Sequence, residues 1–465
     1  MNLSRRNFLA AAPFVQTRRR ASALPNVVFF LTDDHGAWAT GAYGARDIHT
    51  PNIDALARGG ARFTRAYAST PVCSPSRMTY MTGTLPSTHS VQDWLIPEDS
   101  YGPKSRAWLD GHLTWSEVLA KAGYTLGMTG KWHMGHDGEA QRGFSYWATI
   151  PGGGGTYLNP TFVVNGETKK PDRFKTDAVG DYALDFLSRQ KAGQPFCLYM
   201  PFYAPHTPYD PTPEEYSAPY RDSAFRDFPD LPPRAEQNKG LRRMFGSRAA
   251  KLGYSSLITA ADANIGRVLK RLDEMRLREN TLVIFAADQG WNAGHHGVWG
   301  KGNGTVPFNM LEESIRVPLI WNHPGRIRTS APDAMVSSYD FFPTLVDYLG
   351  LEAPASPKRV GRSYAGFLRG RAPSQWRTRL YYEYAYVRAI RTENLKYVER
   401  AEGDPCEMFD LEADPGETRN VYGHPAYRKQ RDAFAGELRR YFEGIGAPPI
   451  NDWRSTMKQK MTAYR

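Results

Sequence analysis

The 465-residue chain is 41% hydrophobic and 23% charged, with a formal net charge of +11. This composition is typical of a folded globular protein and excludes disordered and fibrous classes, and the length favours two unequal domains. The lysines and arginines are scattered and the sequence has no nucleic-acid-binding motif, so we expect no nucleic-acid partner. The positive charge fits either a solvated basic surface or a surface that attracts polyanions toward a cleft.

The N-terminal segment, residues 1–23, has basic clusters on both sides of a short apolar stretch. Residues 4–9, SRRNFL, match twin-arginine export signals, and Ala21-Ser22-Ala23 is a candidate cleavage site. We therefore predict a periplasmic or secreted protein. The alternative is a basic N-terminal tail without an export role. No later segment is long and apolar enough to cross a membrane, so we expect no stable membrane insertion.

Strand-like apolar runs alternate with helical patterns along residues 24–360. Residues 112–135 predict a helix that stops at Gly123 and a strand that ends near Lys131. Further strands are expected at 25–34, 195–202, 281–290 and 317–321, and further helices at 177–190, 254–276 and 338–350. This alternation predicts an α/β fold: a large mixed, mostly parallel sheet sandwiched by helices. Residues 207–250 lack periodicity and predict a long loop near the cleft.

The sequence pattern changes after residue 360. Residues 379–400 predict a β-hairpin with its turn at 392–394, residues 406–421 add a short strand and an acidic turn, and residues 425–446 have the pattern of an amphipathic helix. We therefore predict a smaller C-terminal α+β subdomain at 361–465 that contains an antiparallel sheet.

Polar side chains follow several of the predicted strands. Asp33 and Asp34 end the first, Lys131 and His133 follow the next, His206 follows the strand at 195–202, and Asp288 and Gln289 end the strand at 281–290. Because ligands bind at the carboxyl ends of parallel strands, we expect these residues to meet at one edge. Carboxylate and amide oxygens suit a hard cation such as Ca²⁺ or Mg²⁺, although adjacent acids are often only a solvated turn.

Positively charged side chains near this edge predict an anionic ligand. Lys131, Lys301 and Arg77 would repel a bound cation unless an anion lay between them, and a compact oxyanion such as sulfate or phosphate fits that role. Histidines can transfer protons near neutral pH. Cys73 is one of only three cysteines, whose wide spacing gives neither a disulfide framework nor a paired-cysteine zinc site.

Five ordered motifs resemble those of the type I, formylglycine-dependent sulfatases of the alkaline-phosphatase-like superfamily. Cys73 to Arg77 match the C-x-P-x-R signature, and the likeness extends from about residue 25 to "FDLEADPGETRN" near the C-terminus. The other four blocks are GKWHMG at 130–135, PHTP at 205–208, DQG at 288–290 and GKG at 300–302. The resemblance implies that residues 24–360 form a catalytic sulfatase domain.

The resemblance implies a role for Cys73 and for the residues around it. A separate formylglycine-generating enzyme would oxidise Cys73, and the hydrated aldehyde would attack sulfur and later expel sulfate. The implied calcium ligands are residue 73 together with Asp33, Asp34, Asp288 and Gln289. Many relatives have Asn or His at the position of Gln289, and the amide oxygen of Gln289 can likewise bind calcium. The implied catalytic residues are Cys73, Arg77, Lys131, His133 as a base, His206 as the general acid, and Lys301.

The expected activity is hydrolysis of sulfate monoesters, with a sulfated saccharide or polysaccharide as the preferred substrate and a small aryl or alkyl sulfate as another possibility. Two alternatives remain open at this point. One is a formylglycine-dependent phosphonate monoester hydrolase or phosphodiesterase, and the other is a non-catalytic binder of anionic glycans. His136, His295 and His296 flank the motifs and fit either substrate recognition or structural support.

Overall fold

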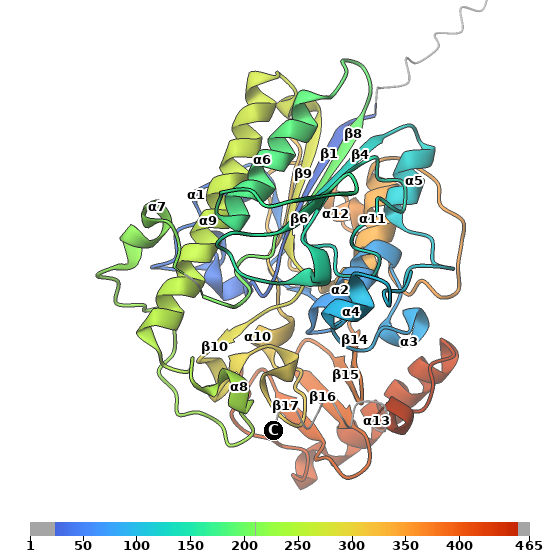
Figure 1. Ribbon diagram of the computed structural model, residues 1–465. Helices are drawn as coiled ribbons and strands as arrows, with labels where there is room; N and C mark the ends of the chain where they lie inside the picture. Colours follow the sequence, from blue (N-terminus) through green and yellow to red (C-terminus); the bar gives the residue numbers. More distant parts are fainter. Residues whose placement is uncertain (1–23, 210, 454–465) are drawn as a thin grey trace, which may run out of the picture.

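The computed structural model describes residues 24–209 and 211–453. The predicted export signal at 1–23 therefore lies outside the described residues. Within them, a nine-stranded sheet has the order β2-β12-β9-β1-β8-β4-β5-β6-β7 (Figure 1). In chain order these strands are β1 (Asn26–Thr32), β2 (Ala61–Arg62), β4 (Thr125–Gly130), β5 (Tyr146–Thr149), β6 (Phe162–Val164), β7 (Glu167–Lys169), β8 (Phe196–Pro201), β9 (Thr281–Ala287) and β12 (Leu319–Asn322).

The centre of this sheet is parallel. Strand β1 lies between β8 and β9, and Phe29 is in register with Tyr199 on one side and Ile284 on the other. Strands β4 and β5 continue the parallel part, whereas β12, β2, β6 and β7 are antiparallel to their neighbours. Every residue of β1 is buried, which explains its continuous apolar run. The predicted α/β fold with a mixed, mostly parallel sheet is confirmed.

Helices cover both faces of the sheet (Figure 1). Val28 and Phe30 belong to the core on the side of α1, α6 and α9, and Phe29 belongs to the core on the side of α2, α5 and α11. The longer helices are α1 (Pro51–Arg58), α2 (Cys73–Thr82), α5 (Trp115–Lys121), α6 (Lys175–Ser188), α9 (Arg248–Glu274), α11 (Phe341–Tyr348) and α13 (Arg428–Gly444). Alternate side chains of β1 thus anchor opposite helical layers.

Helix α9 starts at Arg248 rather than at the predicted residue 254. The Ser247 hydroxyl accepts a hydrogen bond from the Ala250 amide and caps the longer helix. The remaining short elements are α3 (Pro86–His89), α4 (Pro97–Ser100), α7 (Glu214–Ser217), α8 (Lys239–Arg242), α10 (Glu312–Ile315), α12 (Ala365–Leu368), β3 (Ala66–Tyr67), β10 (Asn292–Ala293), β11 (Trp299–Gly300) and β13 (Val336–Ser337). Two of these helices, α7 and α8, lie within the predicted loop at 207–250.

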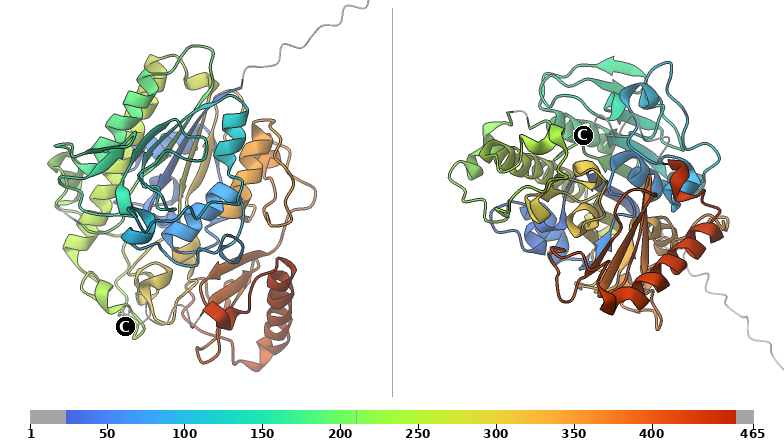
Figure 2. Two further views of the ribbon diagram at one scale, coloured as in Figure 1. Left: turned by 45° about the vertical axis from the view of Figure 1, so that its right-hand side comes forward. Right: turned by 90° about the horizontal axis from the view of Figure 1, so that it is seen from below.

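A four-stranded antiparallel sheet forms the C-terminal part (Figure 2). Its strands are β14 (Leu380–Tyr384), β15 (Val387–Arg391), β16 (Leu395–Arg400) and β17 (Glu407–Asp410). The predicted turn at 392–394 joins β15 to β16, and a second tight turn at Ala385 joins β14 to β15. Phe434, Leu438 and Phe442 of α13 pack on this sheet. The predicted antiparallel sheet is confirmed, while the domain limits at 360 and 361 stay a prediction.

Buried ion pairs join α10 to the C-terminal sheet. Arg391 of β15 donates two hydrogen bonds to the Glu312 carboxylate, at 2.9 and 3.0 Å. Lys396 of β16 pairs with Glu312 and with Glu417. Such pairs fix one arrangement, since removal of either partner leaves a buried charge. Among the described helices, none has both the length and the apolar character that a membrane span requires.

Candidate active site

Cys73 is the first residue of α2 and is only 2% exposed. The extended backbone of Val72 leads into the helix, and Pro75 lies in its first turn, where proline is tolerated. Arg77 follows one helical turn after Cys73 and therefore lies on the same face. The Cys73 Sγ lies 3.4 Å from the Asp33 Oδ1. The start of α2 is therefore at the sheet edge where β1 and β9 end.

Asp33 and Asp34 follow β1, and Asp288 and Gln289 follow the adjacent strand β9. The Gln289 Nε2 lies 3.0 Å from the Asp33 Oδ1 and 2.7 Å from the Asp34 Oδ1. The Asp34 amide donates to the Asp288 Oδ1 at 3.3 Å. Asp34 has φ +64°, a left-handed conformation that non-glycine residues rarely adopt and that clusters at functional sites.

Three cations surround these carboxylates. Arg77 donates from Nε to the Asp288 Oδ2 at 2.8 Å, and Lys131 pairs with Asp33. The Lys301 Nζ lies 2.6 Å from the Asp34 Oδ1 and 2.8 Å from the Cys73 Sγ. Lys131 comes directly after β4 and Lys301 directly after β11, so separate segments deliver the cations to one point.

Two histidines complete the group. The His206 Nε2 lies 3.6 Å from the Asp34 Oδ2, and its Nδ1 is 2.5 Å from the Thr207 carbonyl oxygen. The His133 Nε2 contacts the Leu95 carbonyl oxygen at 2.8 Å, and its buried Nδ1 has no partner among the described residues. His133 also has a positive φ of +59°. Burial lowers the pKa of both histidines.

The charged groups of the site lie close together and shift one another's pKa values. Burial raises the pKa of Asp33, but the surrounding cations, foremost Lys131, outweigh burial and hold that pKa well below its ordinary value. Burial and the charge of Asp33 raise the pKa of Asp288 well above its ordinary value. Burial and the charge of Asp33 also raise the pKa of the Cys73 thiol. Since the thiolate is the reactive form, unmodified Cys73 is a poor nucleophile.

The four oxygen-bearing residues fit a hard divalent cation. Asp33, Asp34, Asp288 and Gln289 are each at most 1% exposed. Within the described part of the chain, the buried Asp34 Oδ2 and Gln289 Oε1 lack hydrogen-bond partners. A half-turn of the Gln289 amide would bring Oε1 toward the two carboxylates that its Nε2 now contacts. Three carboxylates and an amide oxygen are the donors that calcium prefers.

A pocket of about 510 Å³ opens onto this group. The predicted residues that line it are Asp34, Cys73, Lys131, His133, His206 and Lys301. The other four predicted residues, Asp33, Arg77, Asp288 and Gln289, are buried beside them through the contacts above. All ten predicted site residues therefore lie in one cluster. Several further residues line the pocket that no sequence motif predicts, including Trp94, Asn238, Arg243 and Asn303.

The described residues that line this pocket do not include His136, His295 or His296. His136 contacts the Ser105 carbonyl oxygen, and His295 packs on Trp38. His296 pairs with Glu313. Their contacts favour structural support over substrate recognition.

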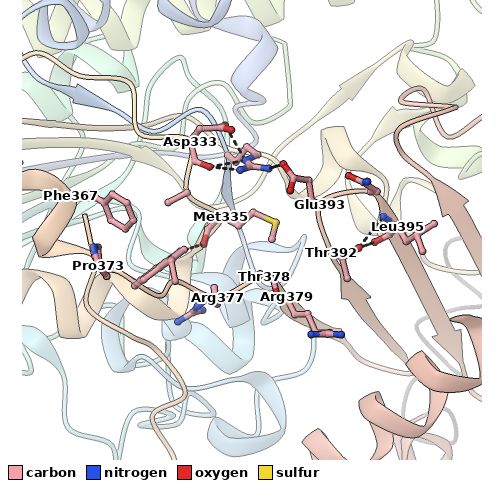
Figure 3. A pocket seen from close by; sticks show the side chains of 14 residues that line it. Asp333, Met335, Phe367, Pro373, Arg377, Thr378, Arg379, Thr392, Glu393 and Leu395 are labelled. Atoms are coloured by element: carbon pink, nitrogen blue, oxygen red, sulfur yellow. Dashed lines mark hydrogen bonds and ion pairs between the residues drawn. The ribbon is translucent and has the colours of Figure 1, made fainter. Parts of the chain in front are cut away.

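A second cavity, of about 600 Å³, lies beside the C-terminal sheet (Figure 3). Its described lining residues include none of the predicted site residues. Each arginine that lines it already has an acidic partner: Arg65 pairs with Asp333 and Glu393, Arg377 with Asp340, and Arg379 with Glu437. The chemistry of the site therefore lies in the smaller pocket.

A central parallel sheet, an acidic cluster at its carboxyl edge and a buried cysteine at the start of a helix beside that cluster fit a hydrolase of the alkaline-phosphatase-like type. The sulfatase family profile matches residues 25–351, and the N-sulphoglucosamine sulphohydrolase C-terminal profile matches residues 294–443. The chain belongs to the sulfatase family, whose members depend on a formylglycine and a divalent metal.

Characterised relatives are similar over most of the chain. An N-acetylglucosamine-6-O-sulfatase of Bacteroides thetaiotaomicron is 26% identical, covering 91% of this chain and 87% of the relative. An ulvan-active sulfatase of Formosa agariphila is 28% identical, covering 91% of this chain and 82% of the relative. A solved structure in complex with its substrate D-glucosamine-2-N,6-O-disulfate has a TM-score of 0.77 at 24% identity, covering 92% of this chain and 99% of that chain. That last likeness concerns the fold alone.

Proposed function

We propose that the protein hydrolyses sulfate monoesters on a sulfated saccharide, with residue 73 acting as a formylglycine. The observation that carries the proposal is the contact of Lys301 with both Cys73 and Asp34 at the floor of the pocket. The Lys301 cation beside residue 73 supports this proposal, because a sulfate group attacked by residue 73 would have to lie next to it. The N-acetylglucosamine-6-O-sulfatase and ulvan-active sulfatase among the relatives support a saccharide substrate.

The modification at residue 73 would be made by a formylglycine-generating enzyme. A hydrated aldehyde at this position supplies one hydroxyl for attack on sulfur and a second for the release of sulfate. Residue 73 is the first residue of α2, and the positive end of the helix dipole there favours negative charge on the modified side chain. Arg77 lies one turn further along and holds Asp288 beside it.

Asp33, Asp34, Asp288 and Gln289 would hold calcium, together with residue 73. Such an ion would supply a concentrated positive charge that stabilises negative charge developing at the site. Asp288 also accepts the hydrogen bond from the Arg77 Nε, which fixes its carboxylate.

The lysines and histidines act on the substrate. Lys131 and Lys301 line the pocket and would bind the sulfate oxygens, with Lys301 next to the attacked sulfur. His206 would act as the general acid from its doubly protonated form: its Nδ1 donates to the Thr207 carbonyl oxygen, and its Nε2, which faces Asp34 at the pocket, would give its proton to the leaving alcohol oxygen. His133 removes a proton during release of sulfate. Neither alternative, the phosphonate hydrolase or the silent glycan binder, is favoured by a separate observation.

The test is the mass of the tryptic peptide from Ala66 to Arg77, from protein produced with a formylglycine-generating system. We expect the mass of an aldehyde at residue 73 and release of sulfate from sulfated sugars, with phosphodiesters as the control. An unmodified cysteine despite active maturation would overturn the formylglycine mechanism. A modified residue with turnover of phosphodiesters alone would overturn the sulfatase assignment.

We also propose export to the periplasm, based on the twin-arginine sequence at residues 4–9. Replacement of Arg5 and Arg6 by lysine should retain the protein in the cytoplasm, which fractionation and immunoblotting would measure. Unchanged export of this variant would contradict the assignment.

A further inference from the structure

One cation in the active-site pocket has no role in the chemistry described above. Arg243 lines the pocket and is exposed, directly after the short helix α8. Within residues 24–209 and 211–453, it makes no ion pair, hydrogen bond or ring contact through its side chain. The two lysines of the pocket, in contrast, already contact carboxylates. Among the described residues of the pocket, Arg243 is thus the cation whose charge no carboxylate partner neutralises.

The segment that carries Arg243 is fastened to the loop that carries Lys301. The Asn238 amide donates to the Gly304 carbonyl oxygen at 2.8 Å, and its side-chain Nδ2 donates to the Asn303 carbonyl oxygen at 3.0 Å. The Gln237 side chain accepts from the Trp299 amide at 2.7 Å and donates to the Trp299 carbonyl oxygen at 3.0 Å.

Apolar packing also holds the same segment. Leu241 and Met244, which flank Arg243, pack against an aromatic cluster that includes Trp291 and Trp299. The backbone that presents the guanidinium is therefore held relative to the sulfate-binding Lys301. A fixed backbone reduces the conformational freedom that Arg243 would lose when it binds a ligand.

Both apolar and polar side chains line the pocket. Trp94, Leu95 and Pro97 line it from one segment, and Asn238, Arg243 and Asn303 line it from two others. An aromatic side chain next to polar groups suits the apolar face and hydroxyls of a sugar ring. The volume of about 510 Å³ lies in the range typical of small-molecule sites.

We infer that Arg243 binds a second anionic group of the substrate, a carboxylate or a further sulfate, while the scissile sulfate lies at Lys301 and residue 73. This inference rests on the proposed function. A guanidinium binds either oxyanion through paired N–H donors. The preferred substrate is then a sulfated saccharide with at least two negative charges.

The test compares Arg243→Ala with the wild-type enzyme on three probes. N-acetylglucosamine 6-sulfate has no second anion, D-glucosamine-2-N,6-O-disulfate adds a sulfate, and a 6-sulfated N-acetylglucosamine linked to a uronic acid adds a carboxylate. We expect the substitution to lower kcat/KM about tenfold on at least one probe with two anions, mainly through KM, and to leave the first probe unchanged. The probe that responds identifies the oxyanion.

Arg242→Ala is the matched control, because Arg242 is an exposed arginine of α8 that is not among the pocket residues. It should leave all three values unchanged. An equal effect of Arg243→Ala on all probes, or no effect on any, would overturn the inference while the sulfatase assignment stands. If the matured wild-type enzyme releases no sulfate from any sulfated sugar, the proposed function itself fails.

Discussion

The Nζ of Lys301 lies 2.8 Å from the Sγ of Cys73, although 228 residues separate the two in the chain. The same Nζ lies 2.6 Å from the Asp34 Oδ1, so one ammonium group joins the start of α2 to the end of β1. Burial lowers the pKa of Lys301, but the charge of Asp34 and its other neighbours outweighs burial and raises that pKa well above its ordinary value. Lys301 is therefore a permanent cation at the point where sulfate charge would develop.

Lys301→Ala should lower kcat by roughly 10²–10³, the usual cost of removing one donor that stabilises a developing oxyanion. Steady-state kinetics on the sulfate substrate would measure this, and mass analysis of residue 73 would show that maturation still occurs. Lys251→Ala, an exchange on α9 outside the pocket, is the control. A fully matured Lys301→Ala enzyme with wild-type kcat would contradict the assigned role.

Removal of divalent cations should abolish activity and lower stability. Asp33, Asp34 and Asp288 are buried carboxylates whose mutual repulsion a cation would relieve. Calcium at a hundredfold excess over its Kd should raise the free energy of unfolding by about 2.7 kcal/mol. Denaturant unfolding with EDTA and with added calcium would measure this, and sulfate release would follow activity in parallel.

Gln289→Ala is the informative variant for the calcium site, since it removes one oxygen donor and no charge. It should require more calcium for the same stabilisation. A chelated enzyme with full activity and unchanged stability would contradict the metal site, and an unchanged calcium titration of Gln289→Ala would remove that residue from it.

Gly153 sets the position of His133. A Cβ at Gly153, which has φ +69°, would lie 2.1 Å from the His133 Cδ2. Gly153→Ala should therefore displace the imidazole and lower kcat by about 10², the cost of a misplacement of about 1 Å. Gly155→Ala is a matched control because Gly155 also has a positive φ, of +96°, but its Cβ would meet only the Lys175 Nζ at 3.7 Å.

Both glycine variants share the backbone strain, and Gly153→Ala adds the steric clash with His133, so its thermal unfolding temperature should fall further than that of Gly155→Ala. Kinetics should separate them: Gly155→Ala should retain most of its kcat. Equal activity of the two variants would show that the position of His133 does not limit turnover.

The gathering of the ten candidate site residues in one cluster was predictable from the sequence because each follows a recognisable local feature. Asp33 and Asp288 end strands whose apolar runs are unmistakable, and Arg77 lies one helical turn after Cys73. Parallel strands carry such ends to one edge without any knowledge of side-chain packing.

The position of Arg243 in the pocket was not predictable in the same way. Arg243 lies in the aperiodic segment 207–250, and its position depends on contacts of residues 237 and 238 with residues 299–304. Nothing local in the sequence encodes that pairing. The sequence likewise does not distinguish Gly153 from any other loop glycine, because its contact with the ring of His133 depends on the tertiary structure.

Stability should fall as the pH rises through the pKa of His296. This side chain is 3% exposed and pairs with Glu313. The Glu417 carboxylate lies 3.8 Å from the His296 Nε2, and Glu417 in turn pairs with Lys396. Burial lowers the pKa of His296, but the hydrogen bond and charge of Glu313 outweigh burial and leave that pKa above the ordinary 6.5. A histidine whose pKa is raised in the folded state stabilises that state fully at pH values below its unfolded-state pKa. This stabilisation is lost as the pH rises through the folded-state pKa.

His296→Gln should therefore lower the free energy of unfolding by about 1–3 kcal/mol at mildly acidic pH, since Glu313 loses a charged partner. The difference from wild type should shrink at alkaline pH, where wild-type His296 is neutral as well. Urea unfolding across the pH range would measure both curves. His424→Gln, a change at an exposed histidine, should leave the wild-type pH dependence intact. If the His296→Gln and wild-type curves stay parallel at every pH, the charged pair does not contribute to stability.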